Sequence, residues 1–510
     1  MAQKALLSVS DKEGIVDLAE ELIDQDFEII SSGGTASKLE ENGIEVERVS
    51  DLTGFPEILD GRVKTLHPKI HGGILYQKEK HEKDIEEHAL PELNLIVVNL
   101  YPFERVTRED HEVEDAIENI DIGGVALLRA AAKNHDRVSV VTDIDDYEMI
   151  SEELEKNDGR IREEVRKELA LKAFQRTARY DTIISGYLNE KYGEDRLPEN
   201  YLVAGEKVKD LRYGENPNQE AAFYRTEYTG ESSVLKAEKL HGKSLSYNNI
   251  RDLEAALDIV KEFEKPAVAA IKHTNPTGVA LKEDIAEAYQ LAYECDPQSI
   301  YGSIISANRP ISVEMAEKMD EIFVEASIAP GYEEGAVDVL KNSKNIRIME
   351  LPGWDPEREG FEFSKVSKGL LIQDRNKSKV TKNDMEVKSE REPTERELDA
   401  MEFAWKVVKH VKSNSIIFTR EDHTVGIGAG QMSRVDAVKI AKMKSRSDTQ
   451  GCTMASDAFF PFRDGVDEAA EAGIESVIQP GGSIRDDEVI EAVDEHGMSM
   501  VFTGQRVFKH

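Results

Sequence analysis

Residues 27–35 read Phe-Glu-Ile-Ile-Ser-Ser-Gly-Gly-Thr, and this stretch indicates the class of the fold. Its apolar start predicts a β-strand, the two glycines predict a turn, and a helix should follow. A strand that leads through a glycine turn into a helix is typical of α/β domains. The amides of such a turn lie at the positive end of the helix and can bind a phosphate, but an ordinary tight turn has the same sequence.

The same alternation continues on both sides of this stretch. Residues 5–9, 95–100 and 138–141 are short apolar runs that predict strands. Ser10-Asp-Lys-Glu13 has the spacing of a capping box, and Ile15, Leu18, Ala19 and Leu22 then recur at helical spacing, so we expect a helix to follow. Residues 163–188 carry apolar side chains at helical spacing and predict a long closing helix. Residues 1 to about 190 are therefore expected to form an α/β domain.

The length of the chain, 510 residues, requires a second domain, because single hydrophobic cores stop growing at roughly 250 to 300 residues. The stretch 189–210 is polar and irregular, so we place the boundary near residue 195 and expect domains at 1–195 and 196–510. The second part again mixes predicted strands and helices, with no internal repeat apparent by eye. The charged stretch 373–397 predicts a loop or a hinge.

The composition excludes several classes of function. Lys and Arg total 65 against 101 Asp and Glu, which gives a net charge of −36, and a field of that sign repels nucleic acid and anionic membranes. No apolar run approaches the roughly 18 residues of a membrane span, and the N-terminus lacks the pattern of a signal peptide. We therefore expect a cytoplasmic protein, and we hypothesise that its acidic surface is adapted to a salty, halophile-like cytoplasm.

The two cysteines give no sign of a disulfide framework or a metal site. Cys295 and Cys452 lie far apart and lack the Cys or His spacing of a zinc site. We expect reduced thiols and no bound metal.

In so acidic a chain, basic residues beside glycine turns are informative. Arg62-Val-Lys-Thr-Leu-His-Pro-Lys69 gathers cations in one turn-rich stretch, which is either an anion site or a solvated loop. Asp121-Ile-Gly-Gly124 precedes an Ala/Leu-rich stretch that predicts a helix ending at Lys133. The glycine amides can stabilise an oxyanion at the start of that helix, or the aspartate can simply cap it.

In the second part, Lys272 and His273 follow a predicted strand, where α/β folds commonly expose reactive side chains. A neutral histidine can take a proton from an amine while the ammonium holds an oxygen or a leaving nitrogen. Adjacent Lys and His residues also occur on surfaces without any function. Residues 456–464 combine three phenylalanines with polar groups, which suits either a slot for a flat ring or a plain core.

The order of these motifs resembles a known family. The chain is similar to the bifunctional purine biosynthesis enzymes, in which aminoimidazole carboxamide ribonucleotide (AICAR) transformylase is joined to inosine monophosphate (IMP) cyclohydrolase. The resemblance runs from residues 6–12 to 505–508. It rests on the motifs SVSDK, SSGGT, GRVKTLHP, NLYPF, DIGG, AAAKNH, LRYGENP, LHGKSLSYNN, KHTNP, SNS, GQMSR and SDAFFPFRD, in this order.

The resemblance implies a fold and a set of partners. It implies an α/β chain with an N-terminal, methylglyoxal-synthase-like parallel-sheet domain and a C-terminal transformylase region of two cytidine-deaminase-like modules that lack zinc. It implies 10-formyltetrahydrofolate as the co-substrate that donates the formyl group. It also implies a homodimer whose transformylase sites are built across the interface.

Position by position, the resemblance also implies the site residues. The implied catalytic residues are Lys64, Tyr101, Asp121 and Lys133 for ring closure and Lys272, His273 and Asn414 for formyl transfer. The implied substrate-binding residues are Ser10, Lys12, Ser32, Gly34, Thr35, Arg62, Thr65, Gly123 and Gly124 in the first domain and Arg212, Tyr213, Arg434, Phe459, Asp464 and Arg506 in the second.

We assign each implied catalytic residue a role in ring closure or in formyl transfer. For ring closure, the amides of the two glycines would stabilise the tetrahedral oxygen while Asp121 assists removal of the amide proton. Lys64, Lys133 or Tyr101 would help water to leave. For formyl transfer, His273 would take the amine proton, and Lys272 would bind the formyl oxygen or protonate the leaving folate nitrogen.

Two positions depart from the family pattern. Asn218 stands where relatives have histidine, and Tyr301 lies in a stretch, 299–303, that also differs. These changes affect local contacts and the packing on the folate side.

Three alternative functions remain open. One of the two domains could be catalytically silent. The protein could instead bind a phosphorylated ligand without turnover, or its first domain could act as a methylglyoxal synthase.

Overall fold

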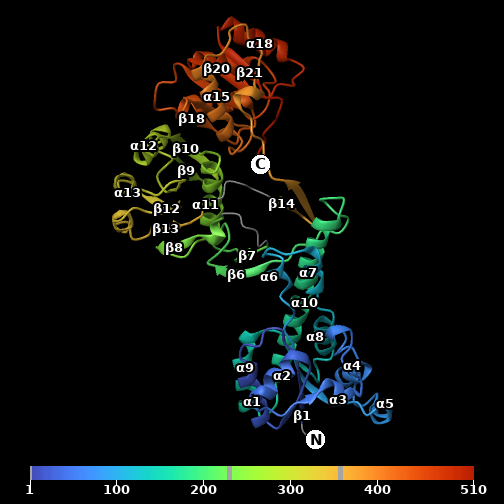
Figure 1. The fold of residues 1–510 in the computed structure, drawn as a ribbon. Coiled ribbons are helices and arrows are strands. Elements are labelled where there is room, and N and C mark those ends of the chain that lie inside the picture. The colour runs from blue at the N-terminus through green and yellow to red at the C-terminus, as the bar shows by residue number, and fades with distance from the viewer. Residues whose placement is uncertain (1–2, 227–232, 354–359) are drawn as a thin grey trace. The chain divides into compact units, whose positions relative to one another are not determined.

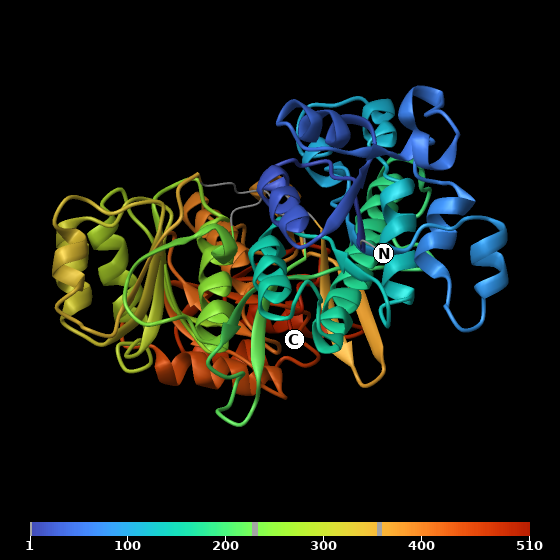
Figure 2. The same cartoon turned by 90° about the horizontal axis from the view of Figure 1, so that it is seen from below.

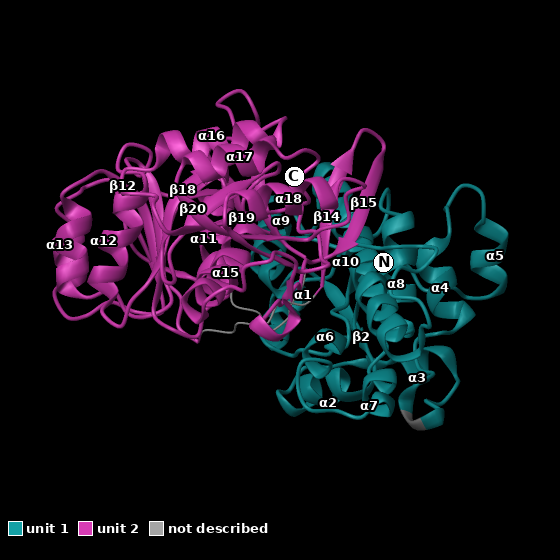
Figure 3. Ribbon diagram, turned by 90° about the horizontal axis from the view of Figure 1, so that it is seen from above, with its two compact units in different colours: residues 1–206 teal, residues 207–510 magenta. Residues whose placement is uncertain are grey.

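The computed structural model describes residues 3–226, 233–353 and 360–510. The chain forms two compact units, Met1–Glu206 (unit 1) and Lys207–His510 (unit 2), each with its own sheets and core (Figure 3). Among the described residues, no helix is both long enough and apolar enough to cross a membrane.

Unit 1 is built on one five-stranded sheet of order β3-β2-β1-β4-β5 (Figure 1). Its strands are β1 (Gln3–Leu7), β2 (Phe27–Ser31), β3 (Glu47–Arg48), β4 (Leu93–Val97) and β5 (Ser139–Val141). Every neighbouring pair runs parallel. The parallel-sheet α/β fold predicted for the N-terminal part is therefore confirmed.

Helices connect the strands of unit 1 and bury their apolar faces against the sheet. They are α1 (Ile15–Asp24), α2 (Gly33–Glu41), α3 (Val49–Thr53), α4 (Pro68–Leu75), α5 (Glu82–Glu87), α6 (Phe103–Val106), α7 (Val113–Glu118), α8 (Gly123–Lys133), α9 (Tyr147–Lys156) and α10 (Glu163–Tyr192). Leu6, Ile30 and Ile96 from the strands and Leu128 from α8 are fully buried in one core cluster. Burial of such side chains contributes about 1.5–3 kcal/mol each, which holds the strand ends in fixed positions.

The capping box predicted at Ser10 and Glu13 is wrong. Helix α1 begins only at Ile15, after Gly14 with a φ of 67°. That left-handed conformation cannot belong to a helix, and Asp11 instead accepts a hydrogen bond from the Glu13 amide at 3.1 Å. The segment after β1 is therefore a loop that leaves its polar side chains available.

Unit 2 contains two six-stranded mixed sheets. The first has the order β10-β9-β11-β12-β13-β8, and the second has the order β16-β21-β20-β19-β17-β18. The strands of the first are β8 (Glu238–His241), β9 (Ala267–Lys272), β10 (Asn275–Leu281), β11 (Ser303–Ala307), β12 (Val324–Ala329) and β13 (Arg347–Glu350). Those of the second are β16 (Glu386–Val387), β17 (Ile416–Thr419), β18 (Thr424–Gly428), β19 (Cys452–Ser456), β20 (Ile474–Gln479) and β21 (Ser499–Phe502).

The two sheets share one topology, so unit 2 contains two modules, as the family resemblance implies, although no repeat is apparent by eye in the sequence. In each, a hairpin (β9–β10 or β17–β18) lies beside an antiparallel neighbour, two parallel strands follow, and an antiparallel strand closes the sheet. We call residues 238–350 the first module and residues 386–502 the second. Figure 2 shows the first in green and yellow and the second in orange and red.

The helices of the two modules follow the same order. They are α11 (Tyr247–Val260), α12 (Ile285–Cys295), α13 (Val313–Asp320) and α14 (Ala336–Leu340) in the first and α15 (Glu395–Val408), α16 (Arg434–Lys444), α17 (Asp464–Glu471) and α18 (Asp486–Glu495) in the second. Leu257 of α11 and Trp405 of α15 are fully buried in one shared core cluster. The edge strands of the two sheets also meet, where the Val279 amide donates to Thr424 Oγ1 at 2.9 Å. The modules therefore pack as one body.

Two small elements complete unit 2. Strands β6 (Glu206–Leu211) and β7 (Ala221–Arg225) pair with each other, and β14 (Phe361–Val366) and β15 (Gly369–Asp374) form a hairpin. The stretch 373–397, predicted as a loop or hinge, is mainly irregular, but it contains the short strand β16 and the first turn of α15.

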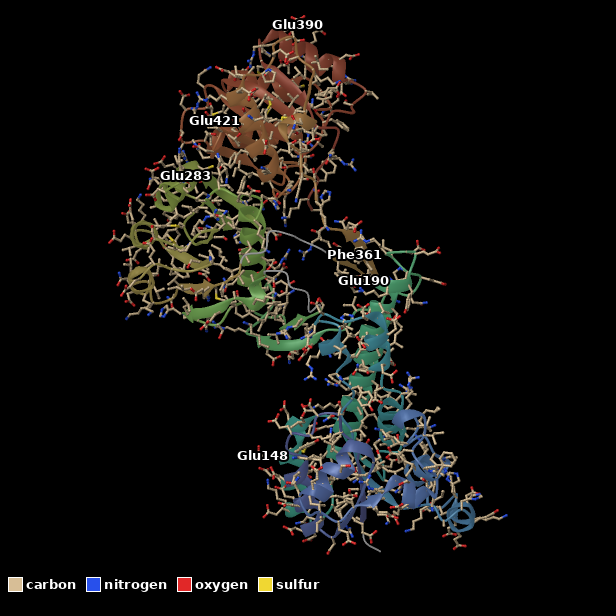
Figure 4. All side chains as sticks on the ribbon, in the orientation of Figure 1. Glu148, Glu190, Glu283, Phe361, Glu390 and Glu421 are labelled. Atoms are coloured by element: carbon tan, nitrogen blue, oxygen red, sulfur yellow. The ribbon has the colours of Figure 1, made fainter. Side chains whose placement is uncertain are left out.

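Many acidic side chains lie on the outside of both units. Glu148 and Glu190 in unit 1 and Glu283 and Glu390 in unit 2 are exposed (Figure 4). Cys295 and Cys452 are buried free thiols. Among the described residues, no group of three or more His, Cys, Asp or Glu side chains is placed to hold a metal ion.

Candidate active sites

The predicted polar residues of unit 1 follow the carboxyl ends of three parallel strands. Ser10 and Lys12 follow β1, Ser32 follows β2, and Tyr101 follows β4. Asn99 Oδ1 accepts hydrogen bonds from the Ser10 and Asp11 amides at 2.6 and 2.9 Å and so fixes the loop after β1. In open α/β sheets, ligands bind at this edge.

The glycine turn after β2 has the features of a phosphate site. Ser32 is 3% exposed, and its hydroxyl has no hydrogen-bond partner among the described residues. A β-carbon placed on Gly34 would lie 3.7 Å from Lys12 Nζ, and one placed on Gly33 would lie 3.3 Å from Lys64 Nζ. Two ammonium groups, the Ser32 hydroxyl and the start of α2 therefore converge on this turn. Glu57 Oε1 accepts a hydrogen bond from the Gly33 amide at 3.0 Å, so a phosphate that binds here must displace this carboxylate.

Two predicted phosphate contacts are already engaged by the protein. Thr35 Oγ1 both accepts from the Val9 amide and donates to the Val9 carbonyl, each at 3.0 Å. Arg62 Nε donates to Glu118 Oε1 at 3.0 Å, and the two side chains form an exposed ion pair. The Thr35 hydroxyl thus holds the turn against the loop after β1. Arg62 can bind a ligand only if its ion pair with Glu118 breaks.

Asp121 lies at the start of α8 and is held from two sides. Its Oδ1 accepts from the Gly124 amide at 2.7 Å and its Oδ2 accepts from the Tyr101 amide at 3.4 Å. Its own amide donates to Tyr180 Oη at 2.9 Å. Burial raises the pKa of Asp121 above its ordinary value, and these amides and the charge of Lys64 oppose that rise only in part. Such a carboxyl suits a proton-transfer role.

Further residues complete this group. Lys64 Nζ donates to Tyr101 Oη at 3.4 Å. A β-carbon on Gly123 would lie 2.9 Å from Thr65 Oγ1. The structure thus brings Lys64, Thr65, Tyr101 and Asp121 together beside the amides that open α8.

Lys133 lies apart from this group within the chain. It is the last residue of α8, ten residues after Gly123, and a rise of 1.5 Å per residue separates the two helix ends by about 15 Å. There it lines a separate, largely apolar pocket with Arg129 and Phe174.

In unit 2, Lys272 ends β9 and His273 follows it in the hairpin turn. Lys272 Nζ donates to the Tyr301 carbonyl at 2.7 Å, a main-chain contact that does not depend on the unusual side chain there. His273 and Thr274 have φ angles of 53° and 62°, in the left-handed region that is costly for such residues. Asp252 of α11 accepts hydrogen bonds from both of their amides, at 3.3 and 2.7 Å. Strained backbone of this kind clusters at active sites.

The predicted third catalytic residue, Asn414, lies on a neighbouring segment. The Lys412 amide donates to Asn275 Oδ1 at 3.0 Å, which joins the segment before β17 to the turn that carries His273. Asn414 Nδ2 donates to the Gln431 carbonyl at 2.9 Å, and its Oδ1 accepts from Arg434 Nη2 at 2.8 Å. The side chain of Asn414 is therefore fixed beside the Lys272–His273 turn.

Arg434, predicted as a ligand contact, is a buried residue that positions Asn414. It is 7% exposed and donates to Ser456 Oγ at 2.7 Å. It also forms an ion pair with Asp457, which is fully buried. Asp457 in turn accepts from the Ser415 amide at 3.2 Å.

The remaining predicted residues are spread over unit 2. The Arg212 guanidinium lies 5.5 Å from the Tyr213 ring centre, and Arg506 lies 4.7 Å from that of Phe508. Phe459 is 36% exposed, and Asp464 opens α17. Among the described residues, none of these side chains has a recorded contact with Lys272 or His273. Unit 2 of one chain therefore presents the predicted transformylase residues as separate groups.

Sequence reasoning missed four residues that shape these sites. Asn99 had a signal, because it stands in the NLYPF motif at a strand end. Asp457 also had one, because it stands in the SDAFFPFRD motif. Asp252 and Tyr180 had none, because each acts on a segment that is distant in sequence.

Comparison with known proteins gives consistent matches. A family model described as the AICARFT/IMPCHase bienzyme matches residues 131–444, more than half of the chain, and one described as an MGS-like domain matches residues 14–126. The chain is 51% identical over 513 residues to the bifunctional purine biosynthesis protein PurH of Bacillus cereus strain AH187, with 100% of both chains covered. It is 50% identical over 513 residues to the protein of that name from Bacillus anthracis, again with full coverage of both. The crystal structure of ForH is 36% identical and covers 36% of this chain and 98% of its own, with a TM-score of 0.33.

Proposed function

Since the chain belongs to the AICARFT/IMPCHase bienzyme family, we propose that its residues for ring closure lie in unit 1 and those for formyl transfer lie in unit 2. The chain is a bifunctional enzyme of purine biosynthesis. It transfers a formyl group from its co-substrate, 10-formyltetrahydrofolate, to AICAR, and it then closes the ring of the product to form IMP with loss of water. The observation that carries the assignment of ring closure is the group of Lys64, Tyr101 and Asp121, together with the Lys64 ammonium close to the glycine turn after β2.

For ring closure, the nucleotide phosphate binds at Ser32 and Gly34, between the ammonium groups of Lys12 and Lys64. The carboxamide nitrogen then attacks the formyl carbon of the same molecule, so correct orientation supplies much of the acceleration. Asp121 takes a proton from that nitrogen, because its raised pKa makes it a better base than an ordinary aspartate.

The oxygen of the tetrahedral intermediate is stabilised at the start of α8 by the amide of Gly123, and by that of Gly124 when it releases Asp121 Oδ1, to which it donates at 2.7 Å. Lys64, held near Tyr101 Oη, supplies the proton with which water leaves. Lys133 lies at the far end of α8 from this group. Its place among the proposed catalytic residues therefore rests on the family resemblance alone.

For formyl transfer, the amine of AICAR attacks the formyl carbon of the folate. His273 takes the amine proton, and Lys272 binds the formyl oxygen or protonates the leaving folate nitrogen. Asn414 is held by Arg434 and Gln431 next to the turn and orients the reacting groups. The cations Arg212 and Arg506 are suited to the nucleotide phosphate, and Phe459 and Asp464 to a flat ring and its polar edge.

The scattered placement of these residues supports a homodimer whose transformylase sites combine residues of two chains. We also place the domain boundary at 195, so that residues 1–195 carry ring closure and 196–510 formyl transfer; α10 ends shortly before this point, at Tyr192. The two modules of unit 2 share the fold of cytidine deaminase in this proposal. The enzyme works in the cytoplasm, and its net charge of −36 suits a salty one.

Paired variants test the assignment of the two sites. Asp121→Asn should lower ring closure of supplied formyl-AICAR at least about a hundredfold while tetrahydrofolate release is unchanged. His273→Gln should do the reverse. Asp110→Asn and Lys265→Met, at exposed positions outside both sites, serve as matched controls. Loss of both activities in either site variant would contradict the separate placement, and full activity in both would remove the proposed roles.

A further inference from the structure

A cavity of about 560 Å³ opens beside the carboxyl ends of β1, β4 and β5. It shares Ser10, Lys12 and Tyr101 with the candidate ring-closure site, but its lining does not include the turn 32–35 or Asp121. A volume of this size holds a small organic ligand. The cavity therefore adjoins the proposed substrate site and extends beyond it.

Four arginines form one wall of the cavity. Arg105 belongs to α6 and Arg108 follows that helix, whereas Arg176 and Arg179 belong to α10. With Lys12 they make five cations in the lining, against three carboxylates. In a chain with a net charge of −36, such a local excess of cations marks a place where an anion binds.

The four arginines of the cavity differ in how they are paired within the chain. Arg108 and Arg179 both pair with Glu104, and Arg179 also pairs with Glu206 at 3.5 Å.

Arg105 and Arg176 have no ion pair with any described side chain, although the chain carries 101 acidic residues. Two planar guanidinium groups in one cavity are thus available for a ligand with several oxygens, such as a phosphate.

We propose that this cavity binds a second phosphate-bearing anion, in addition to the nucleotide whose phosphate binds at the turn 32–35. Arg105 and Arg176 hold its oxygens from α6 and α10. Lys12 lies between the two sites, because it lines the cavity and its Nζ also lies 3.7 Å from the β-carbon position of Gly34. Two anions that share one ammonium repel each other, so occupancy of the cavity weakens nucleotide binding.

Inorganic pyrophosphate is the probe for the first test. Its binding to the full chain is measured by isothermal titration calorimetry at constant ionic strength, with EDTA present. The variant Arg105→Gln/Arg176→Gln should lower the affinity at least about tenfold. The control Arg160→Gln/Lys80→Gln, which removes two exposed cations outside the cavity, should leave it unchanged. Unchanged affinity in the cavity variant, or no binding to the unaltered chain, overturns the proposal.

A second titration distinguishes this cavity from the substrate site. As IMP is raised, the apparent dissociation constant of pyrophosphate should rise about fivefold and then reach a plateau, because the two ligands are coupled but bind separately. A rise without limit would show direct competition at one site and would contradict the proposal.

The source of the phosphate is found from the stoichiometry. If the natural ligand is a nucleotide, the unaltered chain should bind one more IMP than the cavity variant; if it is a free phosphate compound, both should bind the same number of IMP molecules. The inference rests on the proposed position of the substrate phosphate. Unweakened IMP binding in Ser32→Ala would contradict that position, whereas the loss of pyrophosphate binding in the cavity variant is measured without IMP.

Discussion

The carboxylate of Asp252 holds the backbone of His273 in place. Asp252 accepts hydrogen bonds from the amides of His273 and Thr274, two residues in left-handed conformations. Such conformations persist only where the surrounding structure enforces them. The proposed base of formyl transfer therefore depends on a helix residue that lies 21 positions earlier in the chain.

Asp252→Asn should lower the kcat of formyl transfer about tenfold to a hundredfold, because an amide oxygen replaces a charged acceptor of two hydrogen bonds. Burial raises the pKa of Asp252 above its ordinary value. Only the ionised carboxylate can accept both hydrogen bonds, because a protonated carboxyl carries its proton on one of the two oxygens. In the unaltered enzyme, formyl transfer should therefore fall as the pH drops through this raised pKa. That acidic limb should be missing from the pH profile of kcat in the variant. A parallel loss at every pH, with the limb retained, would contradict the positioning role.

Ser31 and Ser32 offer a matched pair for the phosphate turn. Ser32→Ala should raise the KM of ring closure about threefold to tenfold and leave the free energy of unfolding unchanged, because its buried hydroxyl has no partner to lose. Ser31→Ala should lower the free energy of unfolding by about 1 kcal/mol and leave KM unchanged, because the Ser31 hydroxyl donates to the Leu7 carbonyl at 2.7 Å. Steady-state kinetics and urea unfolding measure both. The reverse pattern would remove Ser32 from the site.

Arg434→Met should lower the free energy of unfolding by about 3–5 kcal/mol, because it leaves the fully buried Asp457 without its cation. Formyl transfer should be lost with the orientation of Asn414, while ring closure in unit 1 continues. Lys439→Met, on the same helix, is the control. Urea unfolding and the two separate assays decide the matter; a stable variant that still transfers formyl groups would contradict this role of Arg434.

Glu262 joins the two modules of unit 2. It binds His410 Nε2 at 3.0 Å and Lys409 Nζ at 2.7 Å. Burial alone would raise the pKa of Glu262, but the hydrogen bonds and charges of these two partners outweigh it and lower the pKa to about 2 from 4.5.

A carboxyl with a lowered pKa stabilises the fold above its unfolded pKa, and this contribution is lost as the pH falls from about 4.5 toward 2. Glu262→Gln should therefore cost roughly 3 kcal/mol near neutral pH, and the difference from the unaltered protein should shrink across that acidic range. The exposed Glu264→Gln is the control. Urea unfolding at a series of pH values provides the measurement, and a constant difference would contradict the lowered pKa.

Features with local causes were predictable from the sequence. The turn 32–35 and the helix that starts at Gly123 follow from apolar runs and glycines, and the structure contains both. Helix α1 was predictable from the helical spacing of Ile15, Leu18, Ala19 and Leu22, but the loop before it was not, because Asn99 holds that loop from 89 residues away. The two modules were expected from the family resemblance alone, and their shared order and direction of strands are seen only in the structure.

The candidate sites show the same limit. The motifs contain the residues that meet the proposed substrates, including the Lys272–His273 pair at a strand end. They do not show which residues hold these in place. Arg434 was expected to contact a ligand. Only the three-dimensional structure shows that its guanidinium group donates hydrogen bonds to Ser456, Asp457 and Asn414.

The most direct measurement is one assay of the purified full chain with AICAR and 10-formyltetrahydrofolate, in low and in molar KCl, that follows tetrahydrofolate release and IMP formation together. We predict that both products appear in equal amounts, with greater activity in molar KCl. Tetrahydrofolate without IMP would leave unit 1 catalytically silent, and the absence of both products at every salt concentration would contradict the bifunctional assignment.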